Sequence, residues 1–425
     1  MSANGREVVA GRIRRRMLAA PSTKVPLVGI AMFTFFVVTS RWSNLFTEFG
    51  IFLALFGLLL RPQDLSFPLP IRWAVAFLVW ASISTVFAIS PDIASDALIE
   101  RLKALVIFFV VINALRTPQQ VRFYMLLMLA AFLIYPVRGS LKNYVHGETL
   151  QGRAIWNQIY INPNDLAAIT LLMLGVALAV AVVKTQDRRL RVALIAYVPV
   201  LLVLILLTQS RGVFLGLLVG FGPPLFKGIR RRPSLAGPVL IAAVALAVLI
   251  PAASWNRFES MTKLTSVETL AEADRYGSAL QRWEILKTGW RIFADHPVLG
   301  VGIGCYNEAN ARYAPHLGKK DAHNTYLGLA AEMGIPGLLL WLGMVGSVLG
   351  HVRRRRRSLE ANDRTIRVLW LERAVIGCLV AGLFGTYAGL TILYLFFGTL
   401  WAAASVLGSE PPEAASLSRP ALRRR

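Results

Sequence analysis

The chain has 425 residues, of which 56% are hydrophobic and only 16% are charged. Soluble domains have about 45–50% apolar and about 25% charged residues, so the composition excludes an ordinary soluble enzyme and indicates a membrane protein. Lysine and arginine number 46 against 23 aspartate and glutamate, which gives a net charge of +23. The cations fall mainly between apolar stretches, where they orient a membrane protein and attract anionic headgroups, so we expect no nucleic-acid partner.

Twelve apolar stretches approach the roughly 20 residues that a membrane-spanning helix needs. We therefore expect an all-α polytopic membrane protein with an uncleaved first helix. The fourth stretch is short, and the last two are separated only by small residues around Gly385 and Gly389, which predicts a tight helical hairpin. The expected spans lie near residues 24–40, 43–60, 71–89, 102–115, 121–137, 164–183, 191–208, 211–226, 235–252, 324–350, 369–388 and 389–407.

The placement of lysine and arginine predicts the orientation. Cations crowd the short turns at 184–191 and 227–232 and the run at 353–357, so these segments and both termini are expected in the cytoplasm. Two larger segments, at 136–163 and 253–323, are then expected to face outward. The expected organisation is nine spans in residues 1–252, an outward helical loop at 253–323, three spans at 324–407 and a disordered basic tail at 408–425.

The long outward loop contains an amphipathic pattern at residues 279–293. Trp290 and Phe293 share one helical face, whereas Arg282 falls elsewhere on the wheel. This pattern predicts either a structural helix on the membrane surface or one whose cations bind phosphate. The alternate glycines that follow at 296–304 lack the strand–turn–helix context of a dinucleotide site, so we expect a tight turn back to the membrane.

Four polar residues at expected outward ends of spans have both a structural and a functional interpretation. Arg211 lies in a turn between two apolar helices, where it can snorkel to the interface or place a cation at a polar cavity. His323 begins the tenth span and can be an interfacial residue or a base. Arg138 and Lys142 follow the fifth span and can anchor to headgroups or contact phosphate.

Further residues have simpler structural interpretations. Asn164 or Asp165 is a suitable N-cap for the sixth span. Glu332 lies about 13 Å along the helix from His323, at about 1.5 Å per residue, so it can satisfy polar groups inside the bundle but cannot orient that histidine. The sequence from Gly334 to Gly337 contains a proline and predicts a kink in the tenth span.

Common catalytic motifs are absent from the sequence. There is no Asp-x-Asp pair, no phosphate-binding GxxxxGK[ST] loop, no GxSxG, no HExxH and no Cys/His cluster. The two cysteines, Cys305 and Cys378, lie far apart. If the protein is an enzyme, we expect it to work outside the nucleotide-containing compartment and without a metal or other cofactor.

Four sequence pieces occur in the order typical of one family. With the number of spans and the outward loop, they resemble the O-antigen ligase / O-antigen polymerase superfamily of bacterial envelopes. The pieces are NPNDLA at 162–167, TQSRGVFLGLLVG at 208–220, QRWEILKTGWRIFADHPVLGVGIG at 281–304 and DAHNTYLGLAAEMGIPGLLLWL at 321–342. The loop and HN pieces together are quite specific, whereas the first half of the chain matches only in hydropathy.

The resemblance implies an inverting, metal-independent glycosyltransferase of the inner membrane, with a GT-C-like fold and a site facing the periplasm. It implies a glycan donor on undecaprenyl pyrophosphate and a lipid A–core acceptor, with membrane lipids around the protein. By this resemblance Arg211 and Arg282 match the family's arginines and His323 matches the histidine of its HN motif. Asn324 of the same motif joins Arg138 and Lys142 as further candidates for pyrophosphate binding.

Several related activities fit the same pattern. A polymerase shares the donor chemistry and topology, and exopolysaccharide ligases share the motifs. Protein O-glycosylating relatives usually carry a large C-terminal region, which is not expected here because the chain ends 18 residues after Leu407. A transporter of lipid-linked glycans would also fit twelve spans, but transporters usually have related halves and the motifs here lie only in the second half. The roles of Arg275 and Glu332 stay open.

Overall fold

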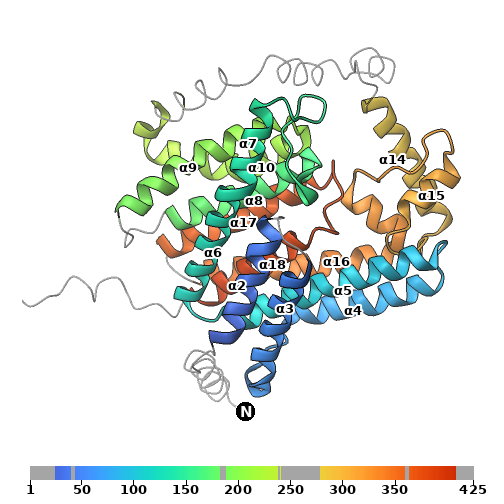
Figure 1. The fold of residues 1–425 in the computed structure, drawn as a ribbon, viewed down its shortest axis with the longest axis horizontal. Coiled ribbons are helices and arrows are strands. Elements are labelled where there is room, and N and C mark those ends of the chain that lie inside the picture. The colour runs from blue at the N-terminus through green and yellow to red at the C-terminus, as the bar shows by residue number, and fades with distance from the viewer. Residues whose placement is uncertain are drawn as a thin grey trace, which may run out of the picture.

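The computed structural model describes residues 24–39, 44–181, 188–237, 240, 278–358 and 363–407, and its regular elements there are helices (Figure 1). The α-helices are α2 (Lys24–Thr39), α3 (Asn44–Leu59), α4 (Leu69–Val86), α5 (Pro91–Ala114), α6 (Pro118–Phe132), α7 (Arg138–Val145), α8 (Pro163–Ala181), α9 (Arg188–Leu207), α10 (Arg211–Arg231), α14 (Ser278–Asp295), α15 (Tyr306–Tyr313), α16 (Thr325–Arg357), α17 (Asp363–Ala381) and α18 (Thr391–Ser405).

Among the described residues, six helical segments are long and apolar enough to cross a membrane. They are α4, α8, α9, α10, α16 and the continuous segment Pro118–Val145, which joins α6 to α7 through a π-helical turn. Three shorter apolar segments, α2, Leu45–Leu59 within α3, and α18, accompany them. The described part of the chain is therefore all-α with several candidate membrane spans, and the twelve expected spans are met in part. Most of the expected ninth span, 235–252, lies outside the described residues.

Helix α5 differs from the short span expected at 102–115. It has 24 residues, and residues 91–103 carry five charged side chains before the apolar remainder of the helix. The preceding turn packs on the glycine-rich segment at 296–305: Ile89 N–H donates to the Val301 carbonyl at 3.0 Å. In the same turn, the Ser90 carbonyl accepts a hydrogen bond from the Cys305 Sγ at 3.5 Å. The polar half of α5 packs on the same segment, since a Cβ on Gly304 would lie 2.5 Å from the Ala97 Cβ, so the helix extends beyond the apolar stretch.

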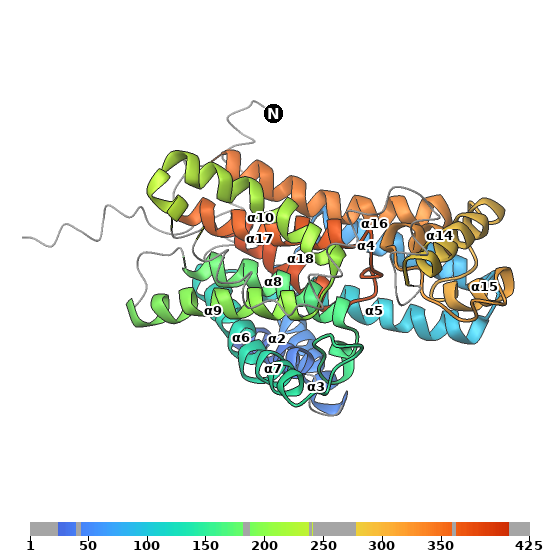
Figure 2. The same ribbon diagram turned by 90° about the horizontal axis from the view of Figure 1, so that it is seen from above.

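Helix α8 forms the centre of the bundle and is buried along nearly its whole length. It packs against α6, α9 and α17, while α10 packs on α17 and α16 packs on α4 (Figure 2). Close packing depends on small residues: a Cβ on Gly175 would lie 2.3 Å from the Ala374 Cβ, and one on Gly216 would lie 2.3 Å from the Gly377 carbonyl oxygen. Small residues at helix crossings are the usual way to bring membrane helices together.

The predicted kink in α16 is confirmed at Gly334, whose φ of 67° and ψ of −172° are not helical. The predicted turn at 296–304 is also confirmed, since Gly300, Gly302 and Gly304 all have positive φ. This turn packs into the kink. Backbone N–H groups of Val301 and Gly302 donate to carbonyls in α16 at 3.0 and 2.9 Å. The amphipathic pattern before the turn forms α14, at the end of the molecule where α15 also lies (Figure 1).

Hydrogen bonds pair segments that the charge pattern assigns to the same side of the membrane. Among segments expected outward, Arg153 donates to Asn164 at 2.7 Å. Among segments expected in the cytoplasm, Ser66 N–H donates to Asn113 Oδ1 at 2.7 Å. The grouping of the loops agrees with the sequence, whereas the compartment that each group faces stays a prediction. The first part of the expected outward loop, 253–277, which includes Arg275, and the expected tail at 408–425 lie outside the described residues.

Candidate active site at three helix starts

The first residues of α8, α10 and α16 are joined by one set of hydrogen bonds. The nine-residue turn between α17 and α18, residues 382–390, links them; this is the predicted hairpin turn. The N-terminal end of a helix carries unsatisfied N–H groups and the positive end of the helix dipole, so helix starts favour anions. Three such ends meet at this place, which we call the three-helix site.

Thr325, the first residue of α16, ties the 382–390 turn to that helix. Its N–H donates to the Gly382 carbonyl and its Oγ1 donates to the Gly385 carbonyl, both at 2.7 Å. The same Oγ1 accepts from the Tyr387 N–H at 2.9 Å. Tyr387 in turn donates its hydroxyl to the Asn164 carbonyl at 3.4 Å, in the first turn of α8.

A buried arginine links α8 to the start of α10. Arg153 is only 9% exposed; its Nε donates to the Thr208 carbonyl and its Nη2 to Asn164 Oδ1, both at 2.7 Å. The same Asn164 oxygen accepts from Ser210 Oγ at 3.0 Å. Ser210 is the N-cap of α10. These contacts fix the chain that leads into α10 against the first turn of α8.

Arg211 follows Ser210 as the first residue of α10 and is partly buried. The residue after it, Gly212, lies against the 382–390 turn: a Cβ there would be 2.6 Å from the Phe384 Cβ. Arg211 is therefore positioned at the three-helix site by neighbours on both sides. The preceding Gln209 has a φ of 51°, a left-handed conformation that is uncommon for a residue with a side chain.

Arg282 and His323 are brought together although 40 residues separate them in the sequence. Helix α14 packs against the start of α16, where a Cβ on Gly289 would lie 2.9 Å from the Leu327 Cδ2. Burial lowers the pKa of His323, and the nearby positive charge of Arg282 lowers it further. The imidazole is thus held in its neutral form, which is the form that accepts a proton.

His323 has a φ of 48°, so its backbone also adopts the left-handed conformation. Sparsely populated backbone conformations cost about 1–3 kcal/mol and cluster at functional sites. The next residue, Asn324, caps α16: its Oδ1 accepts from the N–H groups of Tyr326 and Leu327, both at 3.0 Å. The cap fixes the start of α16, and the left-handed backbone of His323 fixes the direction of the chain that enters the helix.

Electrostatic interactions join the two arginine groups of the site. Burial raises the pKa of Tyr387 well above its ordinary value, while the positive charges of Arg282 and Arg153 both act in the opposite direction. Both guanidinium groups therefore act on one phenol. Acidic groups are present too, because Asp165 in α8 interacts electrostatically with Asp321, two residues before His323. The site is therefore a mixed one, since Arg282, Arg153 and Asp165 all act electrostatically on Tyr387.

The structure assigns other contacts to the remaining predicted site residues. Asn324 has the capping role described above. Arg138 and Lys142 lie exposed on α7, and within the described ranges no hydrogen bond connects either of them to the three-helix site. The N-cap of α8 was expected at Asn164 or Asp165, but this is wrong: Asn162 Oδ1 accepts the Asn164 N–H at 2.9 Å. The side chain of Asn164 instead accepts hydrogen bonds from Arg153 and Ser210.

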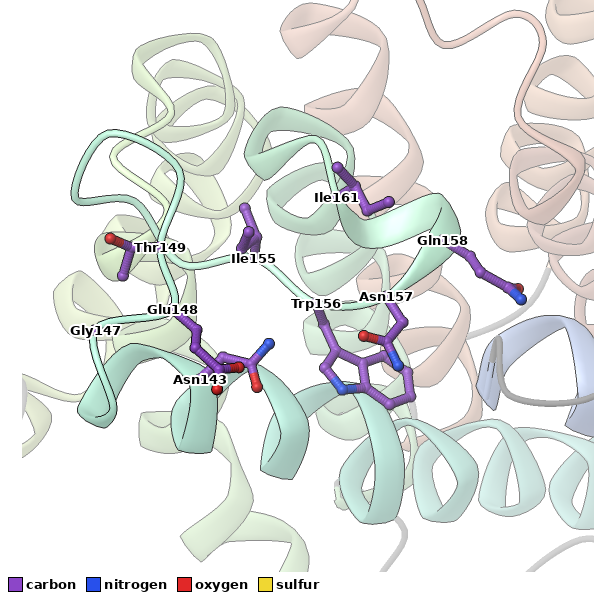
Figure 3. A pocket seen from close by; sticks show the side chains of 9 residues that line it. All are labelled: Asn143, Gly147, Glu148, Thr149, Ile155, Trp156, Asn157, Gln158 and Ile161. Atoms are coloured by element: carbon purple, nitrogen blue, oxygen red, sulfur yellow. The ribbon is translucent and has the colours of Figure 1, made fainter.

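A hollow of about 620 Å³ opens beside the site, in the loop that also contains Arg153 (Figure 3). We call it the amide hollow because several carboxamides line it. Its lining residues are Asn143, Gly147, Glu148, Thr149, Ile155, Trp156, Asn157, Gln158 and Ile161. Trp156 packs on α7, where a Cβ on Gly139 would lie 2.0 Å from the indole Nε1. Carboxamides offer both donors and acceptors, so this wall suits a ligand rich in hydroxyl groups.

Two residues of the site, Arg153 and Tyr387, were not predicted from the sequence. Arg153 is a single cation in a polar segment that also contains Arg138 and Lys142. Charge alone does not distinguish these three residues as candidates for the site. Tyr387 lies in a stretch that looked like the end of the eleventh span, whereas α17 ends at Ala381. The sequence signal that could have found it is the pair of glycines that flank it, Gly385 and Gly389, which mark a turn and not a helix.

The comparisons with known proteins agree with the motifs in the second half of the chain. No curated protein matches the chain. Residues 196–342 match the family model described as O-antigen ligase. This range contains α10, α14, α15 and the first half of α16, and therefore Arg211, Arg282 and His323. The segment from 196 to 342 is thus similar to the O-antigen ligase family.

Proposed function

We propose that this protein is an O-antigen ligase, a glycosyltransferase that moves a glycan from undecaprenyl pyrophosphate to lipid A–core in the periplasm. The observation that carries the proposal is the placement of Arg282 beside His323, both inside the matched domain. A pyrophosphate-linked donor requires cations where the leaving group forms, and a hydroxyl acceptor requires a base. The three-helix site supplies both kinds of group.

In this mechanism Arg211 and Arg282 bind the donor pyrophosphate through charge-assisted hydrogen bonds. As the bond between the anomeric carbon and the pyrophosphate oxygen breaks, negative charge accumulates on that oxygen. Fixed cations and the starts of α8, α10 and α16 stabilise this charge more in the transition state than in the ground state. Arg153 does not contact the donor in this scheme; it holds the chain before Arg211 in place through Thr208 and Asn164.

His323 takes the proton from the acceptor hydroxyl while the oxygen of that hydroxyl forms a bond to the anomeric carbon. The lowered pKa of His323 keeps the imidazole neutral near pH 7 and ready to act as a base, a step typically worth 10²–10⁴-fold in rate. The acceptor attacks opposite the pyrophosphate, so the anomeric centre is inverted and undecaprenyl pyrophosphate leaves. The pyrophosphate linkage provides the driving force, and we propose that no metal or nucleotide is required.

The amide hollow is the place that we propose for the sugar part of a substrate. Two of its lining residues, Thr149 and Ile155, lie on either side of Arg153 in the sequence. The hollow therefore adjoins the segment that binds Asn164. The lipid chain of the donor would lie between helices, with its pyrophosphate at the membrane edge. A polymerase would use the same donor site, and the two activities differ in the acceptor.

The proposal is tested with a deletion strain complemented by the wild type, by His323→Ala or by His316→Ala. His316 is a matched control, since it is an exposed histidine that interacts with Glu284 at 3.6 Å. We expect the deletion and His323→Ala strains to lose the long-chain lipopolysaccharide ladder on a gel while polymer accumulates on undecaprenyl pyrophosphate. The His316→Ala strain should keep the ladder.

Three other results would change the proposal. A core capped by a single repeat unit, with no polymer on the carrier, would identify a polymerase. An unchanged ladder in the deletion strain would mean that lipid A–core is not the acceptor. Retention of function in His323→Ala, with loss only after a cavity-blocking substitution, would favour a transporter of lipid-linked glycans.

A further inference from the structure

A second hollow lies far along α16 from the three-helix site, where the last turn of that helix meets α17. Its volume is about 270 Å³, and it is lined by Arg353, Arg356, Arg357, Glu372, Arg373 and Ile376. Four guanidinium groups from two helices thus meet around one carboxylate. We call it the arginine hollow.

Glu372 neutralises only part of this charge. Its carboxylate is buried; Oε1 accepts from Arg353 Nε at 3.2 Å, and Oε2 accepts from Arg356. Both oxygens of Glu372 are therefore used by these two residues. Arg357 and Arg373 add two further positive charges to the wall of the same hollow. The Nε of Arg373 is buried and has no hydrogen-bond partner in the part of the chain that the structure describes.

The arrangement differs from an ordinary basic helix end. Lysine and arginine near a helix C-terminus interact favourably with the dipole, but side chains that serve only this purpose can spread into water. Here guanidinium groups from α16 and α17 line one cavity, where their mutual repulsion costs energy unless an anion occupies it. Guanidinium groups bind phosphate in a bidentate geometry, which makes phosphate the anion of choice.

The neighbouring surface indicates where that phosphate comes from. Ile376 lies one turn along α17 from Glu372 and forms the apolar part of the wall. A cavity with cations on one side and an apolar side chain toward the span suits a headgroup whose acyl chains continue along the helices. Basic pockets between membrane helices bind anionic lipid headgroups in this way. We propose that the arginine hollow is a binding site for the phosphate of an anionic phospholipid.

This proposal is independent of the glycosyltransferase activity. It also does not require a particular orientation, because it depends only on a phosphate at the membrane surface next to α16 and α17. It adds a lipid-binding role to residues that the sequence explains by topology alone.

The test is native mass spectrometry of the purified full-length protein in a mild detergent with added cardiolipin or phosphatidylethanolamine. Three forms are compared: wild type, Arg357→Gln/Arg373→Gln and Arg354→Gln/Arg355→Gln. The last two lose the same charge, but Arg354 and Arg355 do not line the hollow. Arg353 and Arg356 are left intact because removing them would leave the buried Glu372 without its partners.

We expect the wild type to retain cardiolipin in preference to phosphatidylethanolamine. The Arg357→Gln/Arg373→Gln variant should bind cardiolipin at least about 10-fold more weakly, whereas Arg354→Gln/Arg355→Gln should bind it as the wild type does. Thermal unfolding of all three forms in detergent without added lipid should agree within a few degrees.

Three outcomes would overturn the proposal. Equal loss in both double variants would show a general effect of surface charge. No preference of the wild type for cardiolipin would show that the hollow does not select anionic lipid. A parallel arm with inorganic phosphate alone addresses the source: if phosphate saturates the hollow and cardiolipin does not compete with it, the occupant is a free anion and the lipid assignment is wrong.

Discussion

Arg282 lies close enough to His323 for its charge to lower the pKa of the imidazole, which burial has already lowered. This relationship joins helix α14 to the start of α16. It means that a cation suited to a leaving group and a neutral base suited to an acceptor occupy neighbouring positions. The two roles support each other, because the arginine also keeps the base unprotonated.

The pH dependence of the reaction should report this electrostatic environment. Lys320 also lowers the pKa of His323, whereas Asp321 raises it. If His323 is the base, the acidic limb of the rate profile follows its pKa, since protonation removes the base. Lys320→Gln should therefore move that limb to higher pH, and Asp321→Asn should move it to lower pH.

The measurement is the initial rate of glycan transfer against pH with saturating donor. The two substitutions serve as controls for each other, because they lie side by side and must shift the limb in opposite directions. If the acidic limb shifted in the same direction in both variants, or shifted in neither, it would report a group other than His323.

The kink in α16 should be required for the stability of the site. Gly334 has a φ of 67°, and a Cβ there would lie 1.9 Å from the Val298 carbonyl oxygen. Gly334→Ala should cost about 1–3 kcal/mol from the backbone conformation alone, and it should displace the 296–305 turn that packs into the kink. Gly346→Ala is the matched control in the same helix, since its Cβ would meet nothing within 4 Å.

Thermal unfolding in detergent, followed by circular dichroism, checks this prediction. Gly334→Ala should unfold at a clearly lower temperature and lose transfer activity. Gly346→Ala should be unchanged or slightly more stable, because alanine has the higher helix propensity. Equal stability of the two variants would contradict the view that the 296–305 turn depends on the kink.

Arg153 should act as a positioning residue for Arg211. Arg153→Ala removes the donors to the Thr208 carbonyl and to Asn164 Oδ1, at about 1–3 kcal/mol for each buried group left unsatisfied. Because the segment before Arg211 is then released, kcat should fall while the acidic limb of the pH profile stays in place. Arg153→Lys should rescue little, since one ammonium cannot reproduce the two directed contacts.

Stability and kinetics of Arg153→Ala are compared with those of Arg138→Ala. Arg138 is an exposed cation of the segment between the Pro118 and Pro163 helix starts, which also contains Arg153, so its loss should change stability by less than about 0.5 kcal/mol. A variant at Arg153 with normal stability and normal kcat would show that the network does not position Arg211.

The sequence predicted most of the fold because apolar length and charge placement act locally. Several of the expected spans, the hairpin, the kink at Gly334 and the 296–304 turn follow from composition within a few residues. The extent of α5 was not predictable, because its polar half is held by the 296–305 turn from far along the chain.

The same distinction applies to the site. Arg211, Arg282 and His323 could be proposed as site residues because they lie in motifs that resemble one family. Arg153 has no such motif, and its importance comes from burial against Thr208 and Asn164, which belong to other segments. Asn164 was assigned a capping role from its position alone, whereas the neighbouring Asn162 performs that role. Tertiary contacts decide between neighbours that the sequence cannot distinguish.

The amide hollow gives the last prediction. If it holds the sugar part of a substrate, Asn157→Ala/Gln158→Ala removes two carboxamides from its wall. Each lost hydrogen bond costs about 0.5–1.5 kcal/mol, so the KM of one substrate should rise about 10-fold while kcat changes little. Varying donor and acceptor separately tells which substrate places its sugar there. Gln151→Ala is the control, since Gln151 is an exposed residue of the same loop that shares the left-handed backbone of Gln158 but does not line the hollow. A KM unchanged for both substrates, or raised equally in the control, would exclude the amide hollow as the sugar site and leave the three-helix site unaffected.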